Sequence, residues 1–319
     1  MRYIFNSIVA IIACMAAVSA NAAGKVVPIR YGNMDRWTIR KVSESGVIGG
    51  DTKTLYEIGP NRTISGNKPY VNGGGSPWAT SNVMAKVMGV VKASNSVYRD
   101  RRGKGWCAKL TTHVESVNMM GLKKVDVLAA GSMFLGDMKE PIGDMKDAPK
   151  AINNGIRFTG RPKALRYDYR MQAAGKANRI KLTGFSDKQI VRGRDYATAV
   201  LYLQKRTEDK NGNITAKRVG TMVVKYGKST GGWVNNATYE IMYGDIRKNP
   251  RYDARTMGLR HADYARNSKG KSVLIRETGW AGANEKPTHL MLQFASSHGG
   301  AYVGSVGNTL WVDNVRLVY

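Results

Sequence analysis

SVGNTLWVDNVRLVY, at residues 305–319, indicates the fold class. With the two-residue period of a strand, its apolar residues fall on both faces, as in a strand inside a sheet. One face carries Trp311, Asp313, Val315, Leu317 and Tyr319, and the other carries Leu310, Val312, Asn314, Arg316 and Val318. Asp313 is a carboxylate on an otherwise apolar face, where an unpaired charge is costly. The stretch therefore predicts a buried strand and a partner for Asp313.

Similar short runs of β-branched and aromatic residues recur along the chain, separated by Gly, Asn, Asp and Ser. This spacing predicts an all-β fold, a jelly-roll β-sandwich of antiparallel strands, rather than βαβ units. KNGN at 210–213 predicts a hairpin turn. We expect little helix, with single turns near 187–190 and within 260–267. The predicted strands are 83–92, 106–113, 125–130, 164–171, 197–204, 219–226, 237–243, 272–277, 288–295 and 309–318.

The first 22 residues, MRYIFNSIVAIIACMAAVSANA, have the pattern of a secretory signal peptide, with cleavage before Ala23. Cys14 lies in a loose lipobox, so a lipoprotein anchored through Cys14 is the less favoured alternative. Both interpretations predict export, to the periplasm, the outer-membrane surface or the medium. No later segment has the roughly 20 apolar residues that a membrane-spanning helix needs.

The remaining chain, 23–319, shows no linker and is predicted to be one domain. Residues 25–65 are expected to supply the first strands of the sheet pair, and 66–78 a long loop. After signal removal only Cys107 remains, so an internal disulfide is excluded. The four His residues are scattered, and no metalloprotease, nucleophile-elbow or P-loop motif is present.

The net charge of the chain is +27. Its basic residues are spread over several segments, and such a field attracts polyanions. For an exported protein these are acidic glycans, lipopolysaccharide phosphates, mucins and stray nucleic acid. No specific recognition of nucleic acid is expected. A solubilising basic surface is the alternative. The densest basic stretches are 98–104, 161–170, 191–194 and 247–260.

Two kinds of side chain are candidates for hydrolysing or binding sugars. A glycoside hydrolase needs two facing carboxylates, and the strand candidates are Glu115, Asp126, Asp168, Glu240 and Glu277. The sequence cannot pair them. Sugar binding instead uses aromatic rings with polar neighbours. Trp78, Trp233 and Trp280 lie in Gly-, Ser- or Asn-rich surroundings, although each is also explained as a plug at the end of a sandwich.

The run 164–171 offers the most charged strand face. Leu165, Tyr167 and Tyr169 share one side of it, and Arg166, Asp168 and Arg170 share the other. One side is expected to be core and the other a charged surface that lines a groove.

Several strings together resemble one family. They are GNMDRW (32–37), WATSNVMAKV (78–87), AAGSMFLGDM (129–138), GIRFTGRPKALRYDYR (155–170) and GSVGNTLWVDNVRLVY (304–319). Their order and spacing are similar to the PCMD family, the "putative carbohydrate metabolism domain" of secreted Bacteroidetes proteins. The resemblance implies a jelly-roll domain similar to carbohydrate-binding modules, in organisms that harvest glycans.

In related families of that fold, an acidic residue after the first strand meets an Asp on the last strand at a structural Ca²⁺. Here the corresponding box has Met34 and Asp35 where Phe and Glu are usual, so the resemblance implies Asp35 and Asp313 as a possible structural calcium pair. Hydrogen bonds from backbone N–H groups, or a basic partner, are the favoured alternative for Asp313.

The sequence thus favours a non-catalytic envelope protein that binds polysaccharides or glycoconjugates, with a preference for acidic glycans, beside outer-membrane glycan-uptake proteins. A glycoside hydrolase or lyase is the first alternative and a structural or adhesin component the second. The candidate sugar-binding residues are Trp78, Trp233, Trp280, Arg161, Lys163, Arg166, Asp168 and Arg170.

Overall fold

The computed structural model describes residues 24–45, 51–87, 89–118, 124–144, 147–184, 187–300 and 302–319. The predicted signal peptide, 1–22, and Cys14 lie outside the described residues. No helix in the described ranges is long and apolar enough to cross a membrane. Two helices of one turn are present there, α1 (Ala148–Ala151) and α2 (Ala254–Met257). The predicted all-β sandwich with little helix is confirmed.

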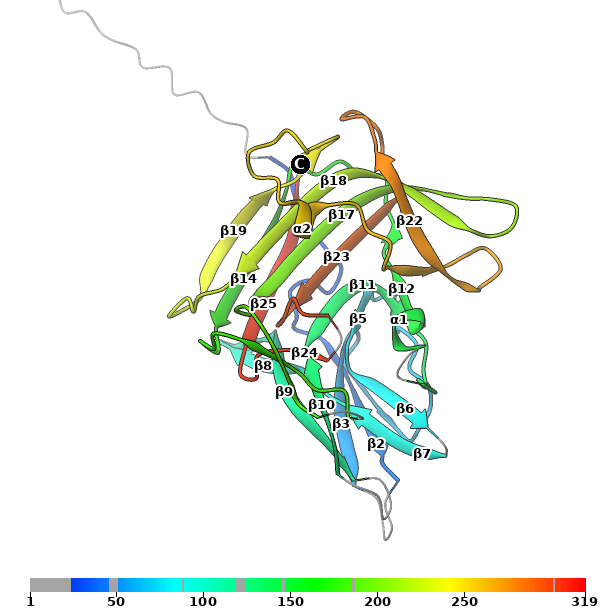
Figure 1. Ribbon diagram of the computed structural model, residues 1–319, viewed down its shortest axis with the longest axis vertical. Helices are drawn as coiled ribbons and strands as arrows, with labels where there is room; N and C mark the ends of the chain where they lie inside the picture. The colour runs from blue at the N-terminus through cyan, green and yellow to red at the C-terminus, as the bar shows by residue number, and fades with distance from the viewer. Residues whose placement is uncertain are drawn as a thin grey trace, which may run out of the picture.

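Two large sheets form the body of the described structure (Figure 1). The seven-stranded sheet has the order β10-β9-β25-β14-β19, with β1 on β25 and β8 on β9. Its strands are β1 (Val26–Pro28), β8 (Val97–Arg102), β9 (Gly105–Asn118), β10 (Lys124–Ala130), β14 (Ala164–Gln172), β19 (Val234–Glu240) and β25 (Thr309–Val318).

The ten-stranded sheet has the order β12-β11-β23-β17-β18-β22-β21, with β5 on β11, β13 on β23 and β20 on β18. Most of its strand pairs are antiparallel, and β18 and β22 are parallel. Its strands are β5 (Trp78–Thr80), β11 (Ser132–Met138), β12 (Ile152–Asn154), β13 (Ile156–Arg157), β17 (Ala197–Glu208), β18 (Ile214–Tyr226), β20 (Met242–Tyr243), β21 (Tyr264–Arg266), β22 (Ser272–Trp280) and β23 (His289–Ala295).

The main core lies between these two sheets. Tyr167 on β14 contacts Phe294 on β23 edge to face, with ring centroids 4.9 Å apart, and its hydroxyl group meets that of Tyr226 on β18. Burial of such apolar surface at about 25 cal/mol per Å² is the main force that holds two sheets together. The strand β25 lies inside its sheet, between β9 and β14, as its two apolar faces predicted.

Three smaller sheets complete the described part of the chain. The first is β2 (Trp37–Ser43), β3 (Thr52–Ile58) and β4 (Arg62–Ser65); the second is β6 (Val83–Val87) and β7 (Val90–Ser94); the third is β15 (Arg179–Lys181), β16 (Gln189–Val191) and β24 (Val303–Gly304). The first two enclose their own small core of Val42, Leu55, Met84, Val91 and Ala93.

Several predicted elements differ from the structure. Residues 25–65 supply only β1 to the sheet pair, because β2, β3 and β4 form a separate sheet. The predicted strand 83–92 is a hairpin of β6 and β7. Helical turns near 187–190 and within 260–267 are wrong, because β16 and β21 occupy those positions. The hairpin turn at 210–213 is confirmed, with Gly212 at a φ of 86° that favours glycine.

A buried ionic cluster ties the small sheet to the sandwich. Arg40 on β2 binds Glu57 on β3 at 3.0 Å and Glu140 at 2.5 Å, and all three side chains are buried. Glu140 also accepts hydrogen bonds from the backbone N–H groups of Tyr70 and Met84. One buried carboxylate therefore fixes the 66–77 loop and β6 at the same point.

Removal of Arg40 tests this cluster. Arg40→Met leaves two buried carboxylates without their cation, so the free energy of unfolding is expected to fall by about 3–5 kcal/mol. Lys41→Met, at the next and exposed position, is the control and is expected to stay within about 0.5 kcal/mol of the parent. Denaturant unfolding measures both; equal effects in the two variants would show that Arg40 contributes no more than a surface cation.

Candidate functional site

The outer face of the seven-stranded sheet gathers four of the predicted site residues. Along β14, Leu165, Tyr167 and Met171 belong to the core. Arg166, Asp168 and Arg170 alternate with them and belong to the other side, as predicted. We call this outer surface the arginine–tryptophan face. It comprises Arg102, Lys109, Arg166, Arg170, Arg316, Trp233 and Trp311, around the pair Asp168 and Asp313.

The middle of this face is a carboxylate pair bridged by an arginine. The register of β14 and β25 sets Asp168 opposite Asp313. Nη1 of Arg102, from β8, lies 2.8 Å from Asp168 and 2.6 Å from Asp313. Asp313 also accepts the backbone N–H of Asn314 at 2.7 Å. Both halves of the favoured alternative for Asp313, a basic partner and a backbone donor, are thus confirmed.

The two carboxyl groups have opposite pKa shifts. Burial raises the pKa of Asp313 to about 6, against the lowering effect of Arg102. Burial also acts to raise the pKa of Asp168, but hydrogen bonds from Asn236, Asn314 and Arg102 bring it below its ordinary value. Asp168 accepts more hydrogen bonds than Asp313, so its ionised form is the better stabilised of the two.

These contacts do not fit a calcium site at Asp35 and Asp313. Asp35 is exposed and accepts hydrogen bonds from Trp106 N–H at 3.0 Å and Asn33 at 2.9 Å. The guanidinium of Arg102 already supplies the positive charge at Asp313. Ca²⁺ takes six to eight oxygen ligands. Among the residues that the structure describes, no three His, Cys, Asp or Glu side chains are grouped to hold a metal ion.

A row of cation, indole and cation crosses three adjacent strands. Trp311 on β25 is directly opposite Arg170 on β14 and Lys109 on β9. The Arg170 guanidinium lies 3.9 Å from the indole centroid and the Lys109 ammonium 5.7 Å. Trp311 is 5% exposed and donates its indole N–H to Asp100 at 2.7 Å. Within the described ranges, neither cation has an ion-pair partner.

A second pair of cations faces each other further along the same two strands. Arg166 is directly opposite Arg316, a placement that costs stability for like charges. Arg166 donates to Thr238 at 2.9 Å. Arg316 donates to Asn236 at 3.1 Å and lies 3.8 Å from Asp168. Only one of these four cations on β14, β25 and β9 thus has a carboxylate within ion-pair distance, among the residues described.

Trp233 is the one predicted tryptophan on this face. It directly precedes β19 and is half-buried, with the Arg102 guanidinium 4.0 Å from its ring centroid. Trp78 is fully buried in the main core and donates its indole N–H to the Arg30 carbonyl, so its ring has no free face for a sugar. Trp280 is half-buried against Met242, Ile246 and Met257. It is on β22 of the ten-stranded sheet, whereas Trp233 precedes a strand of the seven-stranded sheet.

The two remaining predicted residues are not part of this face. Arg161 donates to the backbone carbonyls of Ala283 and Glu285 and covers the Tyr243 ring, which gives it a role in holding the loop after β22. Lys163 is exposed and uses its backbone groups to join Val318 and Ile241. The prediction missed Arg102, Lys109, Trp311 and Arg316, whose outward positions only become visible from the strand registers.

Each candidate catalytic carboxylate is engaged by neighbouring groups. Glu277 is buried against Arg218, and Asp168 is held by Arg102. Glu115 binds Lys53 at 2.8 Å and His113 at 3.1 Å. The other two are Asp126, which accepts a hydrogen bond from Ser116, and Glu240, which pairs with Arg251 at the surface.

Arg102 provides a test of the middle row. Arg102→Met leaves Asp168 and Asp313 opposite each other, so the free energy of unfolding is expected to fall by about 3–5 kcal/mol at pH 7. Without the cation, the pKa of Asp313 lies still further above its ordinary value, and Asp168 loses one of the donors that lower its own pKa, so both folded-state pKa values rise. The deficit is then present at neutral pH and shrinks as the pH falls toward 4.

The exposed neighbour gives the control for this variant. Arg101→Met is expected to cost less than about 1 kcal/mol at either pH, because Arg101 only stacks on Trp106. Denaturant unfolding at pH 7 and pH 4.5 decides the question. A deficit in Arg102→Met that does not change with pH would rule out carboxylate repulsion as its cause.

Comparisons with known proteins identify the family. No curated protein matches this chain. It is similar to a solved structure from Bacteroides thetaiotaomicron VPI-5482, described as a putative glycoside hydrolase, with 17% identity and a TM-score of 0.44 over 86% of this chain and 77% of that one. The family model "Putative carbohydrate metabolism domain" matches residues 56–318. The chain therefore belongs to the PCMD family.

Proposed function

We propose that this chain is an exported, non-catalytic glycan-binding protein whose arginine–tryptophan face binds acidic polysaccharides. Membership of a carbohydrate metabolism family supports a function related to carbohydrates. The observation that carries the rest is a set of four half-buried cations in two rows: Arg166 is directly opposite Arg316, and Arg170 and Lys109 lie on the two sides of Trp311.

The electrostatics of these rows favour an anionic ligand. Arg166 and Arg316 are like charges held opposite each other, which raises the energy of the free protein, and half-burial removes part of the hydration of all four cations. A carboxylate or sulfate group between two such cations relieves both costs and accepts charge-assisted hydrogen bonds. The stacked guanidinium of Arg170 also keeps its N–H edge available, because the ring covers its face.

The spacing of the rows favours a linear polymer. Arg166 and Arg170 are four residues apart on β14, which places the two rows roughly 13 Å apart along the sheet. Between them, Asp168 and Asp313 are buried and neutralised in part by Arg102. A polysaccharide with acidic groups at intervals meets a cationic row at each end of this span.

Binding is favoured over hydrolysis by the state of the carboxylates. A hydrolase requires a proton donor with a raised pKa and a second carboxylate some 5–9 Å away. On this face, the carboxyl with a raised pKa is Asp313 and its neighbour is Asp168, but the Arg102 guanidinium bridges the two and both oxygens of Asp313 have partners. Export by the predicted signal peptide places such a binding protein where polysaccharides are found, beside glycan-uptake proteins of the outer membrane.

Loss of one cationic row is expected to weaken binding selectively. Affinity electrophoresis or titration calorimetry with polygalacturonate at 150 mM salt measures it, with dextran as the neutral polymer. Arg170→Gln combined with Lys109→Gln is expected to raise the Kd at least tenfold, because each charge-assisted hydrogen bond contributes about 1.5–3 kcal/mol.

The control carries the same charge change elsewhere. Arg194→Gln with Lys188→Gln removes one arginine and one lysine from exposed positions away from this face. It is expected to change the Kd less than threefold. Equal weakening by both double variants would show that binding depends on net charge alone. Absence of polygalacturonate binding by the parent protein would exclude the proposed function.

A further inference from the structure

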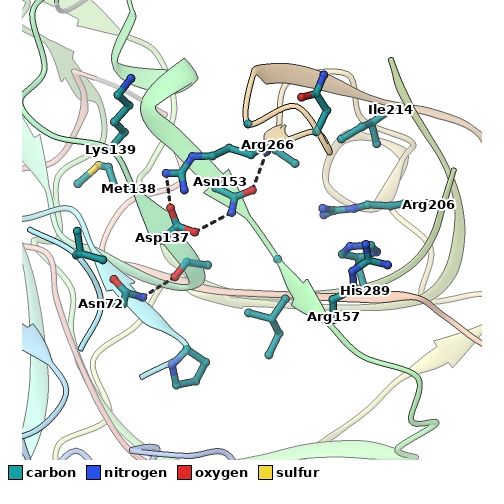
Figure 2. Close-up of a pocket in the computed structure, with 18 of the residues that line it drawn as sticks. Asn72, Asp137, Met138, Lys139, Asn153, Arg157, Arg206, Ile214, Arg266 and His289 are labelled. Atoms are coloured by element: carbon teal, nitrogen blue, oxygen red, sulfur yellow. Dashed lines mark hydrogen bonds and ion pairs between the residues drawn. The ribbon is translucent and has the colours of Figure 1, made fainter. Parts of the chain in front are cut away.

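A cavity of about 950 Å³ lies apart from the arginine–tryptophan face (Figure 2). The 66–77 loop forms one side of it through Pro69, Val71 and Asn72. Strands of the ten-stranded sheet and the turn after β21 form the rest. Its volume falls in the range of roughly 300–1,000 Å³ that is typical of small-molecule sites. None of the residues predicted from the sequence lines it.

One wall of the cavity is basic. Arg157, His289 and Arg206 come from the adjacent strands β13, β23 and β17, and Figure 2 shows the three side chains grouped on one side. His289 is directly opposite Arg157 in the register. In the described part of the chain, neither Arg157 nor Arg206 has a carboxylate within ion-pair distance.

Arg206 is incompletely satisfied. Its Nε donates to Gln204 at 2.8 Å, and its Nη2 is buried without a hydrogen-bond partner. Burial lowers the pKa of Arg206 to about 10. A buried guanidinium with an unused donor is costly unless an anion approaches it.

His289 is kept neutral by the same surroundings. Burial first, and then the charges of Arg206 and Arg157, lower its pKa to about 4. Its Nδ1 lies 2.8 Å from the Thr288 hydroxyl, and no other partner of the ring is present among the residues described. The wall thus holds two cations and a neutral imidazole, whose protonated form a nearby anion would favour.

The carboxylates that line the cavity are already engaged. Asp137 is paired with Arg266 and accepts a hydrogen bond from Asn153 at 2.7 Å, as Figure 2 shows. Glu208 accepts hydrogen bonds from the backbone N–H and the hydroxyl of Ser268, at 2.9 and 2.6 Å. The walls therefore also offer amide, hydroxyl and apolar surface, the mixture that suits a sugar ring.

We infer that this cavity binds a single acidic sugar unit, with its carboxylate on the wall of Arg157, Arg206 and His289 and its hydroxyl groups toward the side of Asn153 and Ser268. The site is separate from the arginine–tryptophan face and independent of the function proposed for that face. It takes the end of a chain or a free sugar acid, whereas the open face takes a length of polymer.

Protein-observed NMR titration at pH 7 with D-glucuronate, D-glucose and inorganic phosphate tests the site. Glucuronate is expected to bind, glucose at least tenfold more weakly, and phosphate more weakly than glucuronate. Arg157→Gln, at an exposed position with little structural role, is expected to raise the Kd for glucuronate about tenfold. Arg194→Gln, which removes the same charge elsewhere, is the matched control and leaves the Kd unchanged.

The arms of this experiment separate the possible outcomes. Phosphate that binds as tightly as glucuronate would overturn the sugar site in favour of an anion site. Absence of glucuronate binding, or equal effects of Arg157→Gln and Arg194→Gln, would overturn the inference altogether. The double variant Arg170→Gln with Lys109→Gln is expected to bind glucuronate normally, so failure of the open face and failure of the cavity are distinguishable.

A pH series adds a readout specific to His289. The charged groups that act on it are Arg157 from β13 and Arg206 from β17, and both oppose its protonation. A bound carboxylate favours the protonated ring and raises its pKa, so binding takes up a proton and the Kd falls between pH 7 and pH 5. His289→Gln is expected to abolish most of this change; the same pH dependence in that variant would exclude His289 as a ligand contact.

Discussion

The pairing of β25 with β9 on one side and β14 on the other is the constraint on which the sandwich and its outer face both depend. The inward side chains of β25 pack in the main core. Its outward side chains lie opposite charged residues of both neighbouring strands. Because side chains alternate with a period of two, a slip of one residue would bury Arg316 and expose Leu317. Core packing therefore also sets which cations face each other on the outside.

The basic character of this protein is organised at two scales. Some of its charge is exposed and paired locally, as in Arg247 with Asp245 and Lys150 with Asp147. Such pairs contribute little to stability and little to recognition. The cations beside Trp311 and on the cavity wall are different, because none of them has a carboxylate within ion-pair distance among the described residues: Arg170, Lys109, Arg157 and Arg206. At those positions we expect an anion of the ligand to take the place that a carboxylate of the protein would otherwise fill.

The sequence was most informative where structure is local. Alternation along β14 correctly predicted its core and outer faces, and a short Asn-Gly motif predicted the hairpin before β18. The two predicted faces of β25 are wrong beyond Asp313, because the register shifts there, with Asn314 at a φ of 53°, and Val315 and Leu317 join the core beside Leu310 and Val312. Trp78 shows the limit of such reasoning. Its Gly- and Ser-rich surroundings predicted a loop, yet it begins β5 and lies in the core. Local composition reflects only the neighbouring residues in the sequence, whereas burial depends on which distant strands cover the side chain.

The site residues depended even more on distant partners. The partner of Asp313 is Arg102, 211 positions earlier in the chain, and no periodic pattern connects the two. The cavity wall likewise combines Arg157, Arg206 and His289 from three strands. Each one alone is an ordinary polar residue on a strand. Only the sheet order makes them neighbours, so the sequence contained no signal for the cavity.

The anchoring of the 66–77 loop has a consequence for the shape of the cavity. Asn72 donates to the backbone carbonyls of Ser76, Trp78 and Gly136, and the backbone N–H of Tyr70 is held by Glu140. Val71, between these two anchors, is 76% exposed and contacts the cavity. A change of side chain at Val71 would therefore alter the wall of the cavity while the anchors at Tyr70 and Asn72 keep the loop on the sandwich.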